Sequence, residues 1–366
     1  MTSAKAAPYS HDEVHLIPTT SQAIIQQTWT NNREEWGKTL DLTTYHAREV
    51  VLANQEFTNN SKLQIWVLVP KTFDPENPDL GLILSAVETF LRPGMVVTKE
   101  LGVRDVASVS VASVFTPAHY RGYGYGSLMM RLLWSRIEQM DNVEFTFLYS
   151  DVGPIFYARM GWDPKRSEEM VIPTDFALPA SGCTVTLDNV TDHSLENLVA
   201  LDAQQLRETM KVQIETTADF TALAAVTPEP TCLQWLHARS RFVAAHVLKL
   251  EQHEITSLGA RDQASNSFVL WFHDLVKSQL FIVRWRVDPS ANQAETVCAL
   301  MGAAQAEAKK WNLSKVVIWN PEQSLGDILG LEIAYRDSAI PSLGLTVSSP
   351  TTSRVEWVMN EKYSWC

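Results

Sequence analysis

The sequence lacks several features that would place it in a specialised class of protein. Its four cysteines, Cys183, Cys232, Cys298 and Cys366, form no C-x-x-C pair and match no zinc-binding spacing. No apolar run approaches the ~18 residues of a membrane span, and residues 1–10 contain no apolar segment like that of a secretory signal. We therefore expect free thiols, no metal, no membrane contact and a cytoplasmic location.

Positive charge is also scarce, because 30 Lys and Arg stand against 42 Asp and Glu, which gives a formal net charge of -12. Binding to nucleic acid requires many basic side chains that replace counterions, so no nucleic-acid partner is expected. The same negative field would attract a small cation such as an amine. The length of 366 residues, with 45% hydrophobic and 20% charged residues, is typical of a globular chain with two domains.

The first half alternates apolar strands with helices. Strands are predicted at Leu63–Val69, Gly81–Leu91 and Val103–Thr116, followed by an amphipathic helix at Ser127–Met140 and a further strand at Phe145–Tyr149. The order strand, helix, strand implies a right-handed crossover onto a parallel pair. The pattern therefore predicts an α/β fold.

A glycine cluster lies between the third of these strands and the helix, with the sequence Arg121-Gly122-Tyr123-Gly124-Tyr125-Gly126. The start of a helix presents unpaired N–H groups, and glycines let a diphosphate approach them closely. The Lys-Ser/Thr of a P-loop is absent, and the glycine spacing is one residue short of the dinucleotide fingerprint. A plain turn is the alternative, but the flanking strand and helix favour a diphosphate cradle.

The R-x-x-G-x-G pattern of this loop resembles the acetyl-CoA signature of the GNAT superfamily of acetyltransferases. The resemblance implies a GNAT fold, that is, a central mixed sheet with flanking helices, and acetyl-CoA as co-substrate without a metal. It also implies that the following residues bind the co-substrate: Val114, Phe115, Arg121, Gly122, Tyr123, Gly124, Tyr125, Gly126, Ser127, Ser150 and Tyr157.

A second segment, from Ser150 through Gly153 and Tyr157 to Gly161 and Trp162, is similar to a GNAT pattern that carries a catalytic tyrosine. The resemblance gives Tyr157 the role of protonating the departing CoA thiolate, a step suited to a phenol that keeps its proton near pH 7. The alternative is that Tyr157 only packs against the sheet.

The resemblance also assigns roles around the thioester. The backbone N–H of Val114 would bind its carbonyl, as an oxyanion-type donor. Some relatives have a glutamate base four residues earlier, where this chain has Ser110. The nearest strand carboxylate is Glu88, which could receive the substrate ammonium and its proton. Alternatively, Glu88 faces solvent or pairs with Arg92.

The second half repeats part of the first. A charged, proline-containing linker is predicted at 166–181, between a catalytic domain at 1–165 and a C-terminal domain at 182–366. Strand candidates at 267–272 and 279–287 precede a helix at 292–311 and another strand at 316–319, but no glycine loop opens this helix. We interpret this α+β domain as a degenerate GNAT-like repeat that cannot bind CoA by itself.

A narrower resemblance rests on Tyr45-x-x-Arg48-Glu49, Glu88-Thr89 and the aromatic tail that ends in Trp365-Cys366. These segments are similar to the fungal lysine acetyltransferases of lysine catabolism. The resemblance implies acetylation of the ε-amine of free L-lysine, the first step of lysine degradation. For such a substrate, Glu88 and Asp274 are candidate partners of the ammonium and Arg284 of the carboxylate.

Two other functions stay open at this point. The protein could acetylate lysine in proteins or histones, or another small amine. It could also be a non-catalytic scaffold that binds acyl-CoA. The oligomeric state is left open, and the aromatic tail is expected to dock on the protein and close the site.

Overall fold

The computed structural model describes residues 7–180, 185–249, 255–346 and 354–366. The elements of the first half are β1 (Val14–Thr19), α1 (Gln22–Trp36), α2 (Leu42–Ala53), β2 (Leu63–Pro70), β3 (Ser85–Thr98), β4 (Gly102–Phe115), α3 (Tyr125–Ile137), β5 (Val143–Ser150), α4 (Ile155–Ala158) and β6 (Asp163–Pro164). Those of the second half are β7 (Glu168–Pro173), β8 (Leu187–Val190), α5 (Asp192–Thr216), β9 (Ala222–Val226), α6 (Pro230–Val243), β10 (Gly259–Asp262), β11 (Phe268–Asp274), β12 (Gln279–Arg286), α7 (Gln293–Lys310), β13 (Lys315–Trp319), α8 (Gln323–Leu329), β14 (Ala334–Tyr335), β15 (Ile340–Leu345) and β16 (Val355–Trp357).

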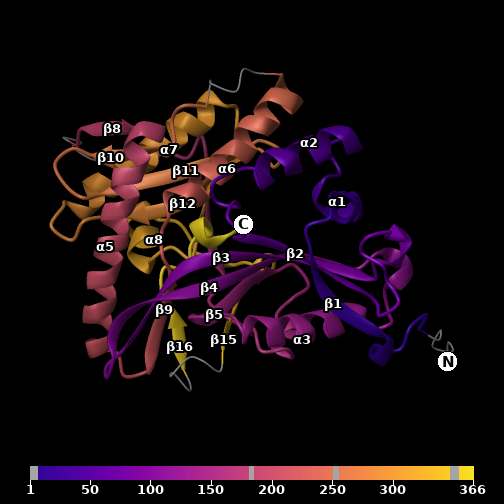
Figure 1. The fold of residues 1–366 in the computed structure, drawn as a ribbon. Helices are drawn as coiled ribbons and strands as arrows, with labels where there is room; N and C mark the ends of the chain where they lie inside the picture. Colours follow the sequence, from indigo (N-terminus) through magenta and orange to yellow (C-terminus); the bar gives the residue numbers. More distant parts are fainter. Residues whose placement is uncertain (1–6, 181–184, 250–254, 347–353) are drawn as a thin grey trace, which may run out of the picture.

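These elements build two mixed sheets with the same strand plan (Figure 1). The first sheet has the order β1-β2-β3-β4-β5-β15-β6, and β9 with β16 extends it beside β3. The second sheet has the order β8-β10-β11-β12-β13-β7-β14. Along both seven-strand paths, one pair is parallel, β4 with β5 and β12 with β13, and the other neighbours are antiparallel. The predicted crossover pair and the predicted repeat are confirmed.

Three strands of the second half, β9, β15 and β16, join the first sheet. Strand β15, near the end of the chain, pairs with β5 and β6 of the first sheet, and β7 pairs with β13 and β14 of the second. Strand β7 falls within the predicted linker 166–181, and its Met170 and Ile172 are buried on one side of the strand. Strands from residues 182–366 thus contribute to both sheets.

Strand β3 continues through Pro93, where the sequence predicted its end. On one edge, β3 pairs with β2 as far as Phe90 and with β9 from Gly94 onward. The N–H of Leu91 points to the β2 edge, where it donates to Lys62 O, so two residues later the ring nitrogen of Pro93 faces the same edge. The missing N–H of Pro93 falls in the gap between two partner strands and costs no ladder hydrogen bond.

The C-terminal tail lies between the two halves of the molecule (Figure 1). Helix α3 lies on one face of the first sheet, α1 and α2 lie on the other, and the C-terminus lies near the centre of the molecule (Figure 1). The tail packs there through Tyr363, which is buried and donates its O–H to Val226 O at 2.6 Å. The expectation that the tail docks on the protein is confirmed.

Two further sequence expectations concern cysteines and the membrane. Cys232, Cys298 and Cys366 form no disulfide among the described residues, and Cys183 lies outside them. No helix in the described part of the chain is long and apolar enough to cross a membrane.

Candidate active site

The glycine loop lies between the end of β4 and the start of α3, as the sequence predicted. Gly122 and Gly124 have φ values of 88° and 82°, a left-handed conformation that favours glycine. A Cβ added at Gly122 would meet nothing within 4 Å, so the loop faces open space there. Gly124 is the N-cap of α3 and supplies no side-chain cap. The first N–H groups of α3 are therefore left for another acceptor, and a diphosphate fits this need.

Several loop side chains have partners within the protein. The Arg121 Nε–H donates to Thr116 O at 2.8 Å, and its guanidinium carbon lies 5.3 Å from the centre of the Phe115 ring. Tyr125 is buried and exchanges hydrogen bonds with both backbone groups of Tyr9. The side chains of Arg121 and Tyr125 thus hold the loop in shape, whereas Tyr123 and Ser127 stay partly exposed beside the helix start.

A bulge in β4 follows the last residue that pairs with β5. The parallel pairing ends at Val111 and Leu148, and β4 pairs with β3 on either side of a register shift that leaves Ser113 and Val114 without partners. Ser113 has a φ of 52°, which is unusual for a residue with a side chain. Ser113 and Val114 thus form a bulge that pairs with neither β3 nor β5, before Phe115 pairs with Ala86 of β3 again, and Val114 is the residue predicted to be the oxyanion-type donor.

Glu88 is held next to this bulge. Its Oε2 accepts a hydrogen bond from Ser113 Oγ at 2.7 Å. Burial, and then the neighbouring Glu49 carboxylate, raise the pKa of Glu88 to about 7, against the lowering effect of the bond from Ser113. Arg92 is not its partner, because the Arg92 guanidinium pairs with Glu229. A carboxylate with a pKa near neutrality beside a free strand position can accept a proton at physiological pH.

Tyr157 lies on α4 and is buried in the core of the first sheet. Burial raises the pKa of its phenol, so the group keeps its proton at neutral pH. The turn that leads to α4 is held by Ser150, whose Oγ–H donates to Gly153 O at 2.7 Å and accepts from Val152 N–H. The Ser150 side chain therefore positions α4, rather than pointing to a ligand.

The two substrate residues predicted in the second half have other partners. Arg284 is buried and donates to both carboxylate oxygens of Asp202, at 2.7 and 2.8 Å, and to Glu361 at 2.9 Å. Asp274 accepts from the backbone N–H of Lys277 in the turn after β11. The prediction of Arg284 as a substrate donor is wrong, because its guanidinium is used in a buried ion-pair network. Asp274 is a turn residue, and its charge acts on Arg239 and Lys362.

Sequence reasoning missed a charged cluster near Glu88. Tyr45 and Arg48 are buried on α2, with the Arg48 guanidinium 4.6 Å from the Tyr45 ring, and Arg48 Nε donates to Glu49 at 2.9 Å. The helical spacing of Tyr45, Arg48 and Glu49 was the available signal, since it puts them near one another on a helix. The charges of Glu49, Arg48, Glu88 and Arg239 all act on the pKa of the Tyr45 phenol.

The tail, residues Glu361–Cys366, packs beside β4 through Cys366. Cys366 Sγ lies 3.1 Å from Ser110 Oγ, at the position where some relatives have a glutamate. The ammonium of Lys362 lies 3.6 Å from the centre of the Trp365 ring and 4.0 Å from that of Trp319. Burial holds the pKa of Lys362 well below its usual value. Ser110 is thus covered by the tail and takes no part as a base.

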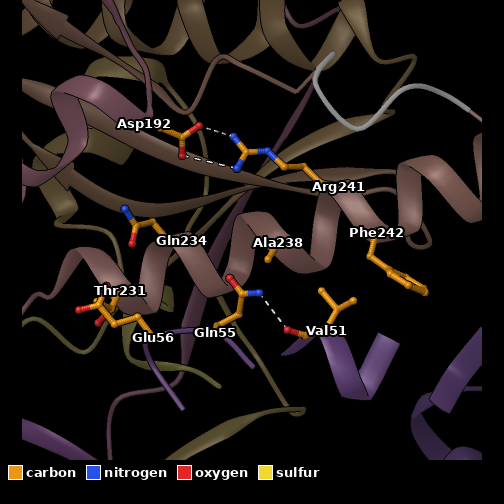
Figure 2. A pocket seen from close by; sticks show the side chains of 9 residues that line it. All are labelled: Val51, Gln55, Glu56, Asp192, Thr231, Gln234, Ala238, Arg241 and Phe242. Atoms are coloured by element: carbon orange, nitrogen blue, oxygen red, sulfur yellow. Dashed lines mark hydrogen bonds and ion pairs between the residues drawn. The ribbon is translucent and has the colours of Figure 1, made fainter. Parts of the chain in front are cut away.

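A pocket of about 480 Å³ lies between α2 and α6 (Figure 2). It is lined by Val51, Gln55, Glu56, Asp192, Thr231, Gln234, Ala238, Arg241 and Phe242. Its arginine and aspartate, Arg241 and Asp192, pair with each other at 2.6 Å. None of the residues predicted for catalysis or co-substrate binding lines this pocket, so it is not the centre of the chemistry.

Known proteins with the same architecture include acetyltransferases. A GCN5-related N-acetyltransferase from Kribbella flavida superimposes with a TM-score of 0.54 over 92% of this chain and 71% of its own, at 14% identity. A probable N-acyltransferase from Enterococcus faecalis gives a TM-score of 0.57 over 91% of this chain and 73% of its own, at 12% identity. At these identities, the similarity shows the fold.

The sequence comparisons narrow the class. The chain is 23% identical over 95% of its length to a protein from Yarrowia lipolytica that is named a lysine acetyltransferase, and the match covers 98% of that protein. Fold and sequence together define an acetyltransferase of the GNAT type, a class that uses acetyl-CoA. The family described as the LYC1 GNAT-like C-terminal domain matches residues 176–366, more than half of the chain, and the chain therefore belongs to this LYC1-like GNAT family.

Proposed function

We propose that this protein transfers the acetyl group of acetyl-CoA to the ε-amine of free L-lysine, as a first step of lysine degradation. The observation that carries the proposal is the placement of Glu88, whose carboxylate is fixed by Ser113 one residue before the unpaired Val114. An acid at this point attracts an ammonium group and can remove its proton. The name of the Yarrowia lipolytica relative supports lysine as the acceptor.

In this proposal, the donor binds at the glycine loop. The N–H groups at the start of α3 face the diphosphate, and Gly122 leaves open space beside them. The Val114 N–H donates to the thioester carbonyl and stabilises the negative charge that develops on its oxygen. Phe115 and Arg121 keep the loop in position.

The amine acceptor reacts from the side of Glu88. The ε-amine is an ammonium ion at pH 7, so it must lose one proton before it attacks. Glu88 accepts that proton, the amine nitrogen forms a bond to the carbonyl carbon, and the carbon–sulfur bond breaks. The Tyr157 O–H then supplies a proton to the thiolate. The second proton of the amine nitrogen, released as the amide forms, restores the phenol through water, and Glu88 passes its proton to solvent.

A panel of acceptors tests the proposal. The protein is incubated with acetyl-CoA and free amino acids, polyamines or lysine-containing peptides, and thiol release is followed together with the mass of the products. We expect L-lysine to be the best acceptor and its ε-nitrogen to carry the acetyl group. Faster turnover of a peptide or polyamine would assign a different acceptor, and acetyl-CoA binding without turnover of any amine would identify a scaffold.

A further inference from the structure

Arg239, on α6, is a partly buried arginine that has no acidic partner. It makes no ion pair and donates no hydrogen bond to any residue in the described part of the chain, and its closest recorded contact is the Trp365 ring, 5.2 Å from the guanidinium carbon. Three other buried arginines pair with acids, Arg48 with Glu49, Arg92 with Glu229 and Arg284 with Asp202, and buried Arg336 donates to the backbone carbonyls of Ser338 and Ala339. A guanidinium held in the interior without a carboxylate is costly unless a ligand supplies one.

The charged groups that act on Arg239 are of both signs. Burial, and then the charge of Arg48, lower the pKa of Arg239. Lys362 also feels the charge of Arg239. The acids that act on Arg239 are Asp274 and Glu49, but Asp274 is bonded to its own turn and Glu49 to Arg48. An anion at this point would lower the free energy of the cluster.

The arginine and the proposed base belong to the same cluster. The tail connects the two groups, because Cys366 Sγ lies 3.1 Å from Ser110 Oγ on β4, and Ala112, two residues further along β4, pairs with Glu88. Glu88 lies at the β4 bulge, and Arg239 lies on α6 against Trp365 of the tail. The site therefore has an acidic end beside the thioester position and a basic end beside the tail.

We propose that Arg239 binds the α-carboxylate of the acceptor, so that the site selects a free amino acid with a distal amine over a lysine within a polypeptide. This inference rests on the proposed function. A planar guanidinium matches a carboxylate with two parallel hydrogen bonds. A lysine within a chain has no free carboxylate to present, so it cannot satisfy Arg239.

The test compares L-lysine with two analogues that keep the distal amine, cadaverine, which lacks the carboxylate, and lysinamide, in which it is uncharged. In the wild-type protein we expect KM to be lower for lysine than for either analogue by about 10- to 100-fold, the range of a charge-assisted hydrogen bond. Arg239→Gln should raise KM for lysine by that factor, leave kcat within a few-fold, and remove the preference over cadaverine. Arg239→Lys should restore part of the preference.

A matched control is Arg241→Gln on the same helix, because Arg241 pairs with Asp192 away from this cluster. It should leave the preference for lysine over cadaverine unchanged. Equal use of lysine and cadaverine by the wild-type protein would overturn the inference without any variant. An Arg239→Gln protein that keeps the preference for lysine over cadaverine would also overturn the inference. If no free amine is acetylated at all, the proposed function itself fails.

Discussion

The two sheets share one strand plan but differ where their parallel strands separate. In the first sheet, the pairing of β4 with β5 ends at Val111, and three residues later Val114 pairs with neither neighbouring strand. In the second sheet, the pairing of β12 with β13 ends at Ile282, and three residues later the Trp285 N–H donates to a carboxylate oxygen of Glu361 at 3.2 Å. The position that is free in the first sheet is occupied by the tail in the second.

The helices that follow these strands differ in the same way. Helix α3 begins after Gly124, which offers no side-chain cap. Helix α7 begins after Asn292, whose side chain accepts from the Glu295 N–H. The comparison teaches that a repeated fold offers a ligand site only where the protein leaves its own N–H groups without partners. This agrees with the interpretation of the second half as a degenerate repeat.

The largest effect is expected at the glycine loop. Gly124→Asp puts a side chain and a negative charge on a left-handed N-cap at the diphosphate position, so we expect acetyl-CoA affinity to fall by at least about 100-fold. Calorimetry with acetyl-CoA measures it. The counterpart in the second half, Asn292→Asp, keeps a good cap and should leave the affinity unchanged. Tight binding by the Gly124 variant would exclude this loop as the donor site.

The next effect concerns Tyr157. Tyr157→Phe removes the proposed acid but keeps the ring in the core, so we expect kcat to fall by about 100-fold while the Kd for acetyl-CoA changes little. Steady-state kinetics and a binding titration separate the two quantities. Tyr335→Phe, on an exposed tyrosine of β14, is the control and should change neither. An unchanged kcat in the Tyr157→Phe protein would show that Tyr157 only packs against the sheet.

The pH dependence distinguishes Glu88 from Glu361, since burial raises the pKa of both carboxyls to about 7. Below pH 7, Glu88 is mostly protonated and cannot accept a proton, so kcat/KM for lysine should rise as pH increases from 6 to 8. Glu88→Gln should lower kcat/KM by about 10- to 100-fold and remove this rise. In the Glu361→Gln protein, kcat/KM should still rise as the pH increases. Loss of that rise would identify Glu361 of the tail, and not Glu88, as the base.

The smallest effect is expected in the pocket between α2 and α6. Gln234→Ala enlarges that pocket but touches none of the charged groups near Glu88. We expect kcat and KM for both substrates to stay within about 2-fold, as for surface changes away from a site. A strong rise in the KM for lysine would place the acceptor in this pocket instead.

Local patterns predicted much of the fold. Apolar runs gave the strands β2, β4, β5, β11 and β12. The sheets that β7 and β15 join could not be predicted, because a short strand such as Glu168–Pro173 has no local signal for which sheet it joins. The end of β3 was also misplaced, since Pro93 is tolerated only because two partner strands leave a gap there.

The candidate site also contains residues that the sequence predicted and residues that it did not. The sequence pointed to the glycine loop, Val114, Glu88 and Tyr157, all of which lie in the first half within motifs of local chemistry. It assigned Arg284 a substrate role and passed over Arg239. No local pattern shows which arginine has an acidic partner: Arg284 pairs with Asp202 and Glu361, whereas Arg239 lies against Trp365.

By itself, the sequence determined that one helix start is free to bind a diphosphate, because glycine has no Cβ and supplies no cap. The tertiary structure alone decided which half keeps an open strand position and that Arg284, but not Arg239, has an acidic partner. Those outcomes depend on where the tail packs. The Glu361 carboxylate accepts a hydrogen bond from the Trp285 N–H of the second sheet, and Trp365 lies against Arg239. Contacts between residues so far apart in the chain arise from packing of the whole molecule, which no local pattern encodes.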